Sequence, residues 1–298
     1  MAAPSVASWE RERASAGVAT RTRARRRFRL GTLLAYIYLA VFALFILFPV
    51  YWIALNAFKL PADILKYPPV WLPKTFTLDN FDTAIQRFNG LGALKNSLLA
   101  AAGSTALALT VGTLAGYSMA RFNTGGKNLS FWLLTQRLIP AVSFIFPTFI
   151  LFKAINWVDT VQALIVLYAV AALPFTIWMM RGYIVEIPPE VEESALVDGC
   201  GRLGVLWRIT LPLAAPGAAA TAIFVFVWGW TEFLFAVILA RTDAVTLPVL
   251  ISSFYGTQQS MQGAASALSL LAMIPVFVLA LTMQRRLVRG LTLGAVKG

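Results

Sequence analysis

Five long runs without a charged residue constrain this chain more than any other feature of its sequence. The runs cover residues 30–58, 96–120, 160–180, 209–231 and 244–284. A helix needs roughly 20 apolar residues to cross a hydrocarbon core about 30 Å thick. Hydrophobic residues make up 59% and charged residues 13% of the 298 residues, whereas soluble domains average about 45–50% and about 25%. The composition therefore predicts an all-α integral membrane protein.

Six transmembrane helices are predicted, near residues 32–55, 97–119, 130–151, 161–181, 217–239 and 263–284. The third is the least regular because Arg137 interrupts it. An even number of spans places both termini on one side of the membrane, and lysines and arginines concentrate on that side. Such residues favour the cytoplasmic side, so both termini are expected in the cytoplasm.

One membrane domain is expected, because no internal repeat or low-complexity linker divides the chain. Residues 1–29 predict a disordered, basic, cytoplasmic N-terminus, residues 30–284 the transmembrane domain, and residues 285–298 a cytoplasmic tail. Prolines inside the predicted spans are expected to kink their helices; they are Pro49, Pro140, Pro147, Pro174 and Pro275. The small residues of 216–222 should let another helix approach closely.

The net charge of +12 raises nucleic-acid binding as an alternative. However, the arginine cluster at residues 21–29 directly precedes a membrane span, where arginines fix orientation and contact anionic headgroups. The expected contact is therefore the lipid bilayer, and no nucleic acid. The chain has no histidine and a single cysteine, Cys200, so the usual general base and the commonest metal ligand are missing. Neither a catalytic residue nor a metal site is expected.

A polar segment at residues 186–212 separates the fourth and fifth predicted spans. Its two prolines and three glutamates predict a helix start at about residue 190; they are Pro188, Pro189, Glu190, Glu192 and Glu193. Gly199 and Gly201 then permit a sharp turn with positive φ. A second helix is expected over residues 202–209, with one apolar face formed by Leu203, Leu206 and Trp207.

Three interpretations of this helix, turn and helix compete. The pair could lie on the bilayer surface as an amphipathic unit, or bind DNA as a helix-turn-helix. The acidic first helix would repel phosphate, which disfavours DNA. The third interpretation follows from the pattern E-x-A-x3-G-x9-I-x-L-P, which begins at Glu193 and ends at Pro212. This pattern resembles the cytoplasmic coupling loop of importer-type ABC permeases.

Other stretches narrow the resemblance to the carbohydrate class, the relatives of the smaller permease subunit of the maltose transporter. They are Asn56–Lys59 with Pro68 and Pro69, Thr77–Asn80, Trp230–Phe235 and the tail from Gln284 to Gly298. The resemblance covers nearly the whole chain beyond residue 30. It implies an importer-type ABC permease fold with a cytoplasmic coupling helix between spans 4 and 5.

The resemblance also implies which residues couple the chain to an ATPase: Glu193, Ser194, Ala195, Asp198, Gly199, Ile209, Leu211 and Pro212. Two departures from the family pattern are visible. Ser194 replaces the usual alanine, a small-for-small change, and Thr231 stands where the family typically has asparagine before Glu232.

The implied function is a subunit of an ATP-driven importer that moves a sugar or oligosaccharide by alternating access across a bacterial plasma (inner) membrane. The implied partners are a second homologous permease, two ATP-binding subunits and an extracytoplasmic substrate-binding protein. The motif G-x4-G-K-[ST] is absent from this chain, so ATP and Mg are expected on the partner subunits and no cofactor on this chain, which is not an enzyme. The alternatives are a permease for glycerol phosphate, an amino acid or a polyamine, an ion channel, or a membrane enzyme.

Polar residues within the predicted spans are candidates for a substrate pathway, because an ionisable group at membrane depth costs about 2.5–3.5 kcal/mol on insertion scales. The candidates are Gln136, Arg137, Trp228, Trp230 and Glu232. Tryptophan faces and a carboxylate suit sugar binding, but tryptophan is also common at bilayer interfaces. Arg137 could equally serve helix packing, Glu232 could lie at the interface, and the two could pair.

Overall fold

The computed structural model describes residues 30–257 and 261–292, and the described residues form helices with no strand among them. In chain order these are α2 (Leu30–Ala57), α3 (Pro61–Ile64), α4 (Asp79–Asp82), η1 (Thr83–Arg87), α5 (Gly90–Arg121), α6 (Gly126–Thr135), η2 (Gln136–Leu138), α7 (Val142–Ala154), α8 (Val161–Val185), α9 (Pro189–Val197), α10 (Arg202–Val205), η3 (Leu206–Thr210), α11 (Leu211–Thr231), α12 (Leu234–Leu239), α13 (Leu247–Thr257) and α14 (Gln262–Thr292). The chain divides into two compact units, Met1–Val50 and Tyr51–Gly298. The predicted disordered N-terminus, residues 1–29, lies outside the described residues.

Five helices in the described part of the chain are long and apolar enough to cross a membrane. They are Gly31–Ala57, Gly90–Arg121, Val161–Val185, Arg202–Thr231 and Gln262–Thr282. These helices correspond to the first, second, fourth, fifth and sixth predicted spans. The all-helical membrane fold is therefore confirmed, while the count of six spans stays a prediction.

The third predicted span, residues 130–151, is wrong as a continuous helix. It is divided into α6, the 3-10 turn η2 and the shorter apolar helix α7. Pro140 lies at the break, and Ile139 before it is extended, with φ −79° and ψ 126°. A proline disfavours helical backbone at the preceding residue, so the helix ends there.

Other boundaries also differ from the predicted ones. The fifth span was expected over residues 217–239, but α11 ends at Thr231 because Glu232 is extended, and α12 follows as a separate short helix. The last helix, α14, continues to Thr292, so the start of the predicted C-terminal tail is helical. Helices continue through four of the five prolines expected to kink them, namely Pro49, Pro147, Pro174 and Pro275.

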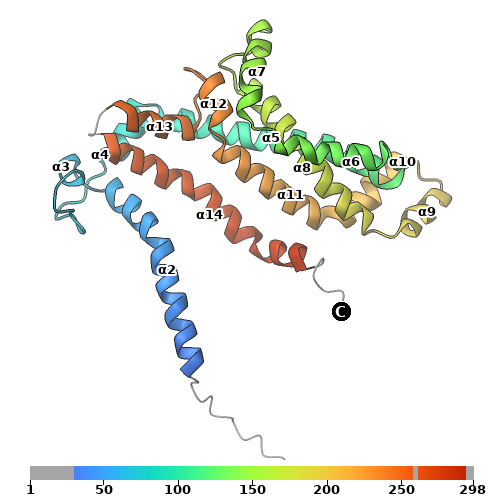
Figure 1. Ribbon diagram of the computed structural model, residues 1–298, viewed down its shortest axis with the longest axis horizontal. Helices are drawn as coiled ribbons and strands as arrows, with labels where there is room; N and C mark the ends of the chain where they lie inside the picture. The colour runs from blue at the N-terminus through green and yellow to red at the C-terminus, as the bar shows by residue number, and fades with distance from the viewer. Residues whose placement is uncertain (1–29, 258–260, 293–298) are drawn as a thin grey trace, which may run out of the picture. The chain divides into compact units, whose positions relative to one another are not determined.

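Three helices of the second unit, α5, α8 and α11, pack side by side (Figure 1). Small residues make this possible. A Cβ at Gly116 of α5 would stand 3.0 Å from the backbone nitrogen of Arg181 in α8. A Cβ at Gly217 of α11 would overlap the ring of Tyr183 in α8, which confirms that the small residues of 216–222 admit a neighbouring helix. Such close backbone approach lets helices associate without a hydrophobic driving force in lipid.

Two of the stretches that carried the family resemblance meet where α2 ends. The side-chain amide of Asn80 donates to the carbonyls of Ala57 at 3.0 Å and Lys59 at 2.7 Å. Lys59 is fully buried; its ammonium donates to Asn56 Oδ1 at 3.1 Å and lies 4.3 Å from the Trp52 ring centroid. Helix ends leave carbonyls without intrahelical partners, so these contacts terminate α2 and fix the segment that follows it.

Asp159 joins two loops at one end of the second unit. Its carboxylate accepts backbone N–H bonds of 2.8–3.1 Å from Arg241, Thr242, Asp243 and Ala244. Burial acts to raise the pKa of Asp159, but these four backbone hydrogen bonds outweigh it and hold the pKa well below its ordinary value. The ionised carboxylate thus fastens the α7–α8 loop to the chain that precedes α13.

Asp159→Asn is expected to destabilise the subunit by about 1–3 kcal/mol, because an amide oxygen accepts fewer and weaker bonds than a carboxylate. A depressed folded-state pKa gives stability that is present above the unfolded-state pKa and lost as pH falls through the folded-state value. The difference from wild type should therefore be full near pH 7 and narrow below about pH 4. Melting of the detergent-solubilised subunit measures this, with exposed Asp243→Asn as the matched control; equal melting at pH 7 would contradict the prediction.

Candidate coupling site

The segment between α8 and α11 forms the predicted pair of helices joined by a turn. Pro188 and Pro189 start α9, close to the predicted start at about residue 190, and the helix ends at Val197. Gly199 has φ +87°, as predicted, whereas Gly201 has φ −69°, so its predicted positive φ is wrong. The second helix does not stop near residue 209, because α10 continues through the π-helical turn η3 into α11.

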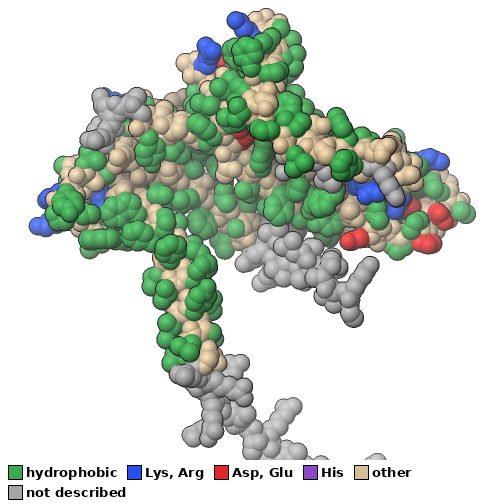
Figure 2. Space-filling model, viewed as in Figure 1, with side chains coloured by type: hydrophobic (Ala, Val, Ile, Leu, Met, Phe, Trp, Pro, Cys, Tyr) green, Lys and Arg blue, Asp and Glu red, His purple; other side chains and the backbone are tan. Residues whose placement is uncertain are grey.

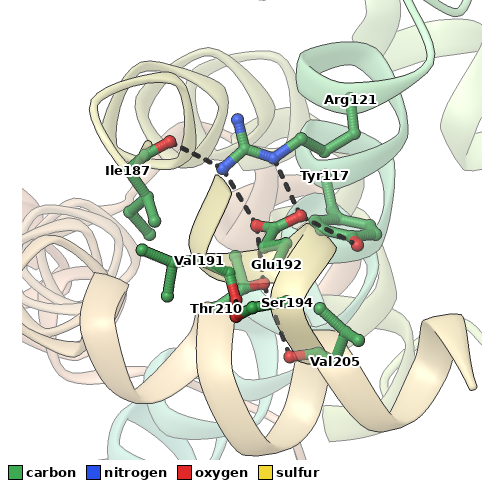
Figure 3. A network of polar contacts seen from close by, with 8 residues as sticks. All are labelled: Tyr117, Arg121, Ile187, Val191, Glu192, Ser194, Val205 and Thr210. Carbon is green, nitrogen blue, oxygen red and sulfur yellow. Dashed lines mark hydrogen bonds and ion pairs between the residues drawn. The ribbon is translucent and has the colours of Figure 1, made fainter. Parts of the chain in front are cut away.

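A buried carboxylate lies at the centre of this segment. Glu192 of α9 pairs with Arg121 at the end of α5, through Nη2 to Oε1 at 2.9 Å and Nε to Oε2 at 3.0 Å (Figure 3). The hydroxyls of Tyr117 and Thr210 donate to the same carboxylate at 3.3 and 2.8 Å. Arg121 also donates to the carbonyl of Ile187 at 2.9 Å. The network therefore connects α5, α9 and η3.

The sequence placed Glu192 only among the acids of a first helical turn, and its role in the network was missed. The sequence carried one signal, because Glu192 and Ala195 are spaced i and i+3 and so share a helix face. In the structure both residues are buried. Arg121 could not be found from local sequence because it is far from Glu192 along the chain. Its side chain and that of Glu192 are only 11% and 7% exposed.

The outward face of the segment is rich in apolar side chains. Exposed positions are Val191, Leu196, Val197, Leu203 and Trp207. Leu206, which was expected to share a face with Leu203 and Trp207, is instead buried. Acidic and basic side chains gather around this end of the second unit, where α9 and α10 lie (Figure 2). An exposed apolar surface bordered by charge is typical of a protein-docking surface.

The predicted coupling residues divide between this outer face and the interior. Glu193, Ser194, Asp198 and Pro212 are exposed, Ile209 and Leu211 are half-buried, and Ala195 is buried. The Ser194 hydroxyl donates to the carbonyl of Val191 at 3.0 Å, within its own helix. The exposed side chain of Glu193 can thus contact another protein, whereas the buried Ala195 packs α9 against the rest of the subunit.

The structure separates the five candidate pathway residues. Gln136 and Trp228 line one cavity of about 560 Å³ between η2, α8 and α11. Trp230 is buried elsewhere, where its indole N–H donates to the carbonyl of Ala272 in α14 at 3.1 Å. Glu232 accepts the backbone N–H of Phe235 at 3.0 Å and so caps α12. The backbone of Arg137 lies in η2, and its side chain is not described.

Within the described residues, no group of three or more His, Cys, Asp or Glu side chains could hold a metal ion. The polar clusters at Glu192 and Asp159 are instead satisfied by hydrogen bonds from the chain itself. The geometry of the segment suits mechanical contact with another protein.

Comparisons with known proteins identify the family of the chain. A family model described as "Binding-protein-dependent transport system inner membrane component" matches residues 108–293. The trehalose transport system permease protein of Mycobacterium tuberculosis is 36% identical over 256 residues, covering 85% of this chain and 93% of the relative. The diacetylchitobiose uptake system permease protein of Streptomyces coelicolor is 33% identical over 255 residues, covering 85% and 92%.

The fold is similar to a chain in the crystal structure of a bacterial ABC transporter involved in the import of the acidic polysaccharide alginate. The TM-score is 0.73 at 20% identity, over 87% of this chain and 97% of that chain. The family model and these relatives, together with the fold, define an integral membrane permease of the ABC importer type. The chain belongs to the family of binding-protein-dependent transport system inner membrane components, and its relatives include sugar permeases.

Proposed function

We propose that this chain is the permease subunit of an ATP-driven importer that translocates a sugar or oligosaccharide delivered by an extracytoplasmic binding protein. The observation that carries the proposal is the α9–α10 segment, which exposes an apolar face around Glu193 while Glu192 ties it to the membrane helices. The printed substrates of the relatives, trehalose and diacetylchitobiose, support a saccharide.

The coupling step takes place on this exposed face. Two ATP-binding subunits hold ATP and Mg, and one of them seats against α9 and α10, while a second homologous permease completes the channel. Their nucleotide-driven closure moves α9, and the permease helices alternate between outward-facing and inward-facing arrangements. With the α9–α10 face toward the cytoplasm, both termini and Cys200 also lie in the cytoplasm of a bacterial cell.

The cavity that Gln136 and Trp228 line is the proposed sugar contact of this chain. An indole face packs against sugar C–H groups, and an amide both donates to and accepts from hydroxyls. Trp230 and Glu232 then act indirectly. Trp230 holds α14 in place, and Glu232 holds α12. Arg137 stays a candidate at the edge of this cavity through its position in η2.

The test is to purify the complex with its partner permease, ATPases and binding protein, and to measure ATP turnover against a panel of saccharides. Stimulation by one saccharide is expected. Stimulation by glycerol phosphate, an amino acid or a polyamine alone would replace the sugar with that solute. Absence of any co-purifying ATPase, or modification of Cys200 only from outside the cell, would overturn the proposed function.

Replacing Glu232 with Gln is expected to lower transport by about 3- to 10-fold, because a neutral amide weakens the charge-assisted caps on Phe235 and Ala236 and loosens α12. Transport of the stimulating saccharide in proteoliposomes measures the effect. Thr231→Ser, which keeps the neighbouring hydroxyl, is the control. Unchanged transport in Glu232→Gln would show that these caps do not affect transport and would remove Glu232 from the candidate pathway residues.

A further inference from the structure

The coupling segment is covalently joined to two membrane helices but touches a third. Along the chain, α9 follows α8, and α10 leads through η3 into α11. The helix α5 is far away in sequence, yet its last turns reach α9 through Tyr117 and Arg121 (Figure 3). Glu192 is the residue on α9 that receives both of these contacts.

The geometry of the Glu192 contacts fixes α9 in position and in rotation. Arg121 holds both carboxylate oxygens, at 2.9 and 3.0 Å. Such bidentate pairs fix orientation as well as distance. Tyr117 adds a bond to Oε2 and Thr210 a bond to Oε1, from two different elements. A rotation of α9 would therefore break bonds to α5 and to η3 at once.

Burial makes this arrangement difficult to loosen gradually. Ile184, Ile187, Leu206 and Ala214 are buried together with Tyr117 in one apolar cluster beside the ion pair. A buried charge that loses its partner is strongly destabilising. Partial opening therefore leaves a charged group without a partner, and the helix moves together with the network.

The helix α5 in turn is locked to α8. Gly112 and Gly116 bring its backbone against Thr176, Ile177 and Arg181 of α8, with atoms near 3 Å from an added Cβ. The two helix backbones are therefore in direct contact along these turns. A displacement that enters α5 through Glu192 is therefore shared with α8 at its membrane-embedded turns.

We propose that Glu192 is a positioning residue of the coupling step: its contact with Arg121 fastens α9 to α5, so that movement of the docked ATPase displaces α5 and α8 as one body. The proposal rests on the proposed function. It adds a contact inside this chain, behind the face that meets the ATPase, that transmits the movement to α5.

The experiment uses the assembled complex with cysteine-free partner subunits. Cys200 is the single cysteine of the chain, so one added cysteine, Leu114→Cys on an exposed position of α5, gives a pair for spin labels. Distances are measured without nucleotide and after trapping with ATP and orthovanadate. Wild type is expected to show one narrow distribution of label-to-label distances that is the same with and without trapped nucleotide. In Glu192→Gln the distance distribution is expected to be broad and to shift between the two states.

Three further variants make the result decisive. Glu190→Gln makes the same charge change on an exposed position of α9 and should keep the narrow distribution. The exchange Glu192→Arg with Arg121→Glu should restore it. If Glu192→Gln does not assemble, Tyr117→Phe removes one bond from α5 to Glu192 without leaving a charge unpaired and should broaden the distribution in the same way.

The outcomes separate the two proposals. A narrow, unchanged distance in Glu192→Gln or Tyr117→Phe, with the ATPases bound, overturns the positioning role and leaves the proposed function intact. An ATPase that never binds the wild-type chain overturns the proposed function itself. A merely stabilising role would lower the yield of complex without making the distance depend on nucleotide, and so would also overturn the positioning role.

Discussion

Gly199→Pro is expected to lower ATP-driven transport by about 100-fold while the subunit stays in the membrane. Gly199 has φ +87°, and proline holds φ near −65°. The Gly199 amide also donates to the carbonyl of Leu196 at 3.1 Å, and proline has no such donor. The turn between α9 and α10 cannot form, so the docking face is disassembled although α8 and α11 remain intact.

Transport and ATP turnover in proteoliposomes measure this effect together. Gly201→Ala is the matched control, because Gly201 has an ordinary φ of −69° and open space around an added Cβ. Glu193→Lys is expected to cause the same loss of transport, since it reverses a charge on the exposed docking face without removing a contact inside the subunit. Normal substrate-stimulated ATP turnover in an assembled Gly199→Pro or Glu193→Lys complex would contradict the coupling role.

The hydrophobic runs predict much of this fold because lipid imposes one simple rule. Backbone groups in hydrocarbon must be satisfied within the segment, so a charge-free run of sufficient length becomes a helix, as α2, α5, α8 and α14 show. The rule does not cover the third predicted span, because Arg137 leaves no charge-free run of that length there, and the helix breaks before Pro140.

The site was predictable in its local parts only. Gly199 was found because its turn depends on a single backbone angle. Glu192 was not found, because its burial depends on its contact with Arg121, and local sequence patterns do not show that these two distant residues meet. Trp230 shows the same limit: its sequence context fits either a sugar path or an interface, and the structure instead directs its N–H to α14. Contacts between distant helices are decided by packing, which one sequence does not display.

Gly116→Leu is expected to have the largest effect on assembly. An added Cβ would stand 3.0 Å from the nitrogen of Arg181, 3.2 Å from the carbonyl oxygen of Ile177 and 3.2 Å from Met180 Cβ. Two of these neighbours are backbone atoms, which cannot move aside unless α5 and α8 separate. Overpacking of this kind costs about 3 kcal/mol, and the lost contact between helices has no hydrophobic replacement in lipid.

The yield of monodisperse complex and its melting temperature in detergent measure this cost. Gly182→Leu on α8 is the matched control, since no heavy atom lies within 4 Å of an added Cβ there. Both variants add the same apolar volume to a long helix, so only the close approach of α5 and α8 distinguishes them. Wild-type yield and melting in Gly116→Leu would mean that the two helices do not need this contact. The proposal that α5 and α8 move as one body, on which the positioning role of Glu192 depends, would then also be wrong.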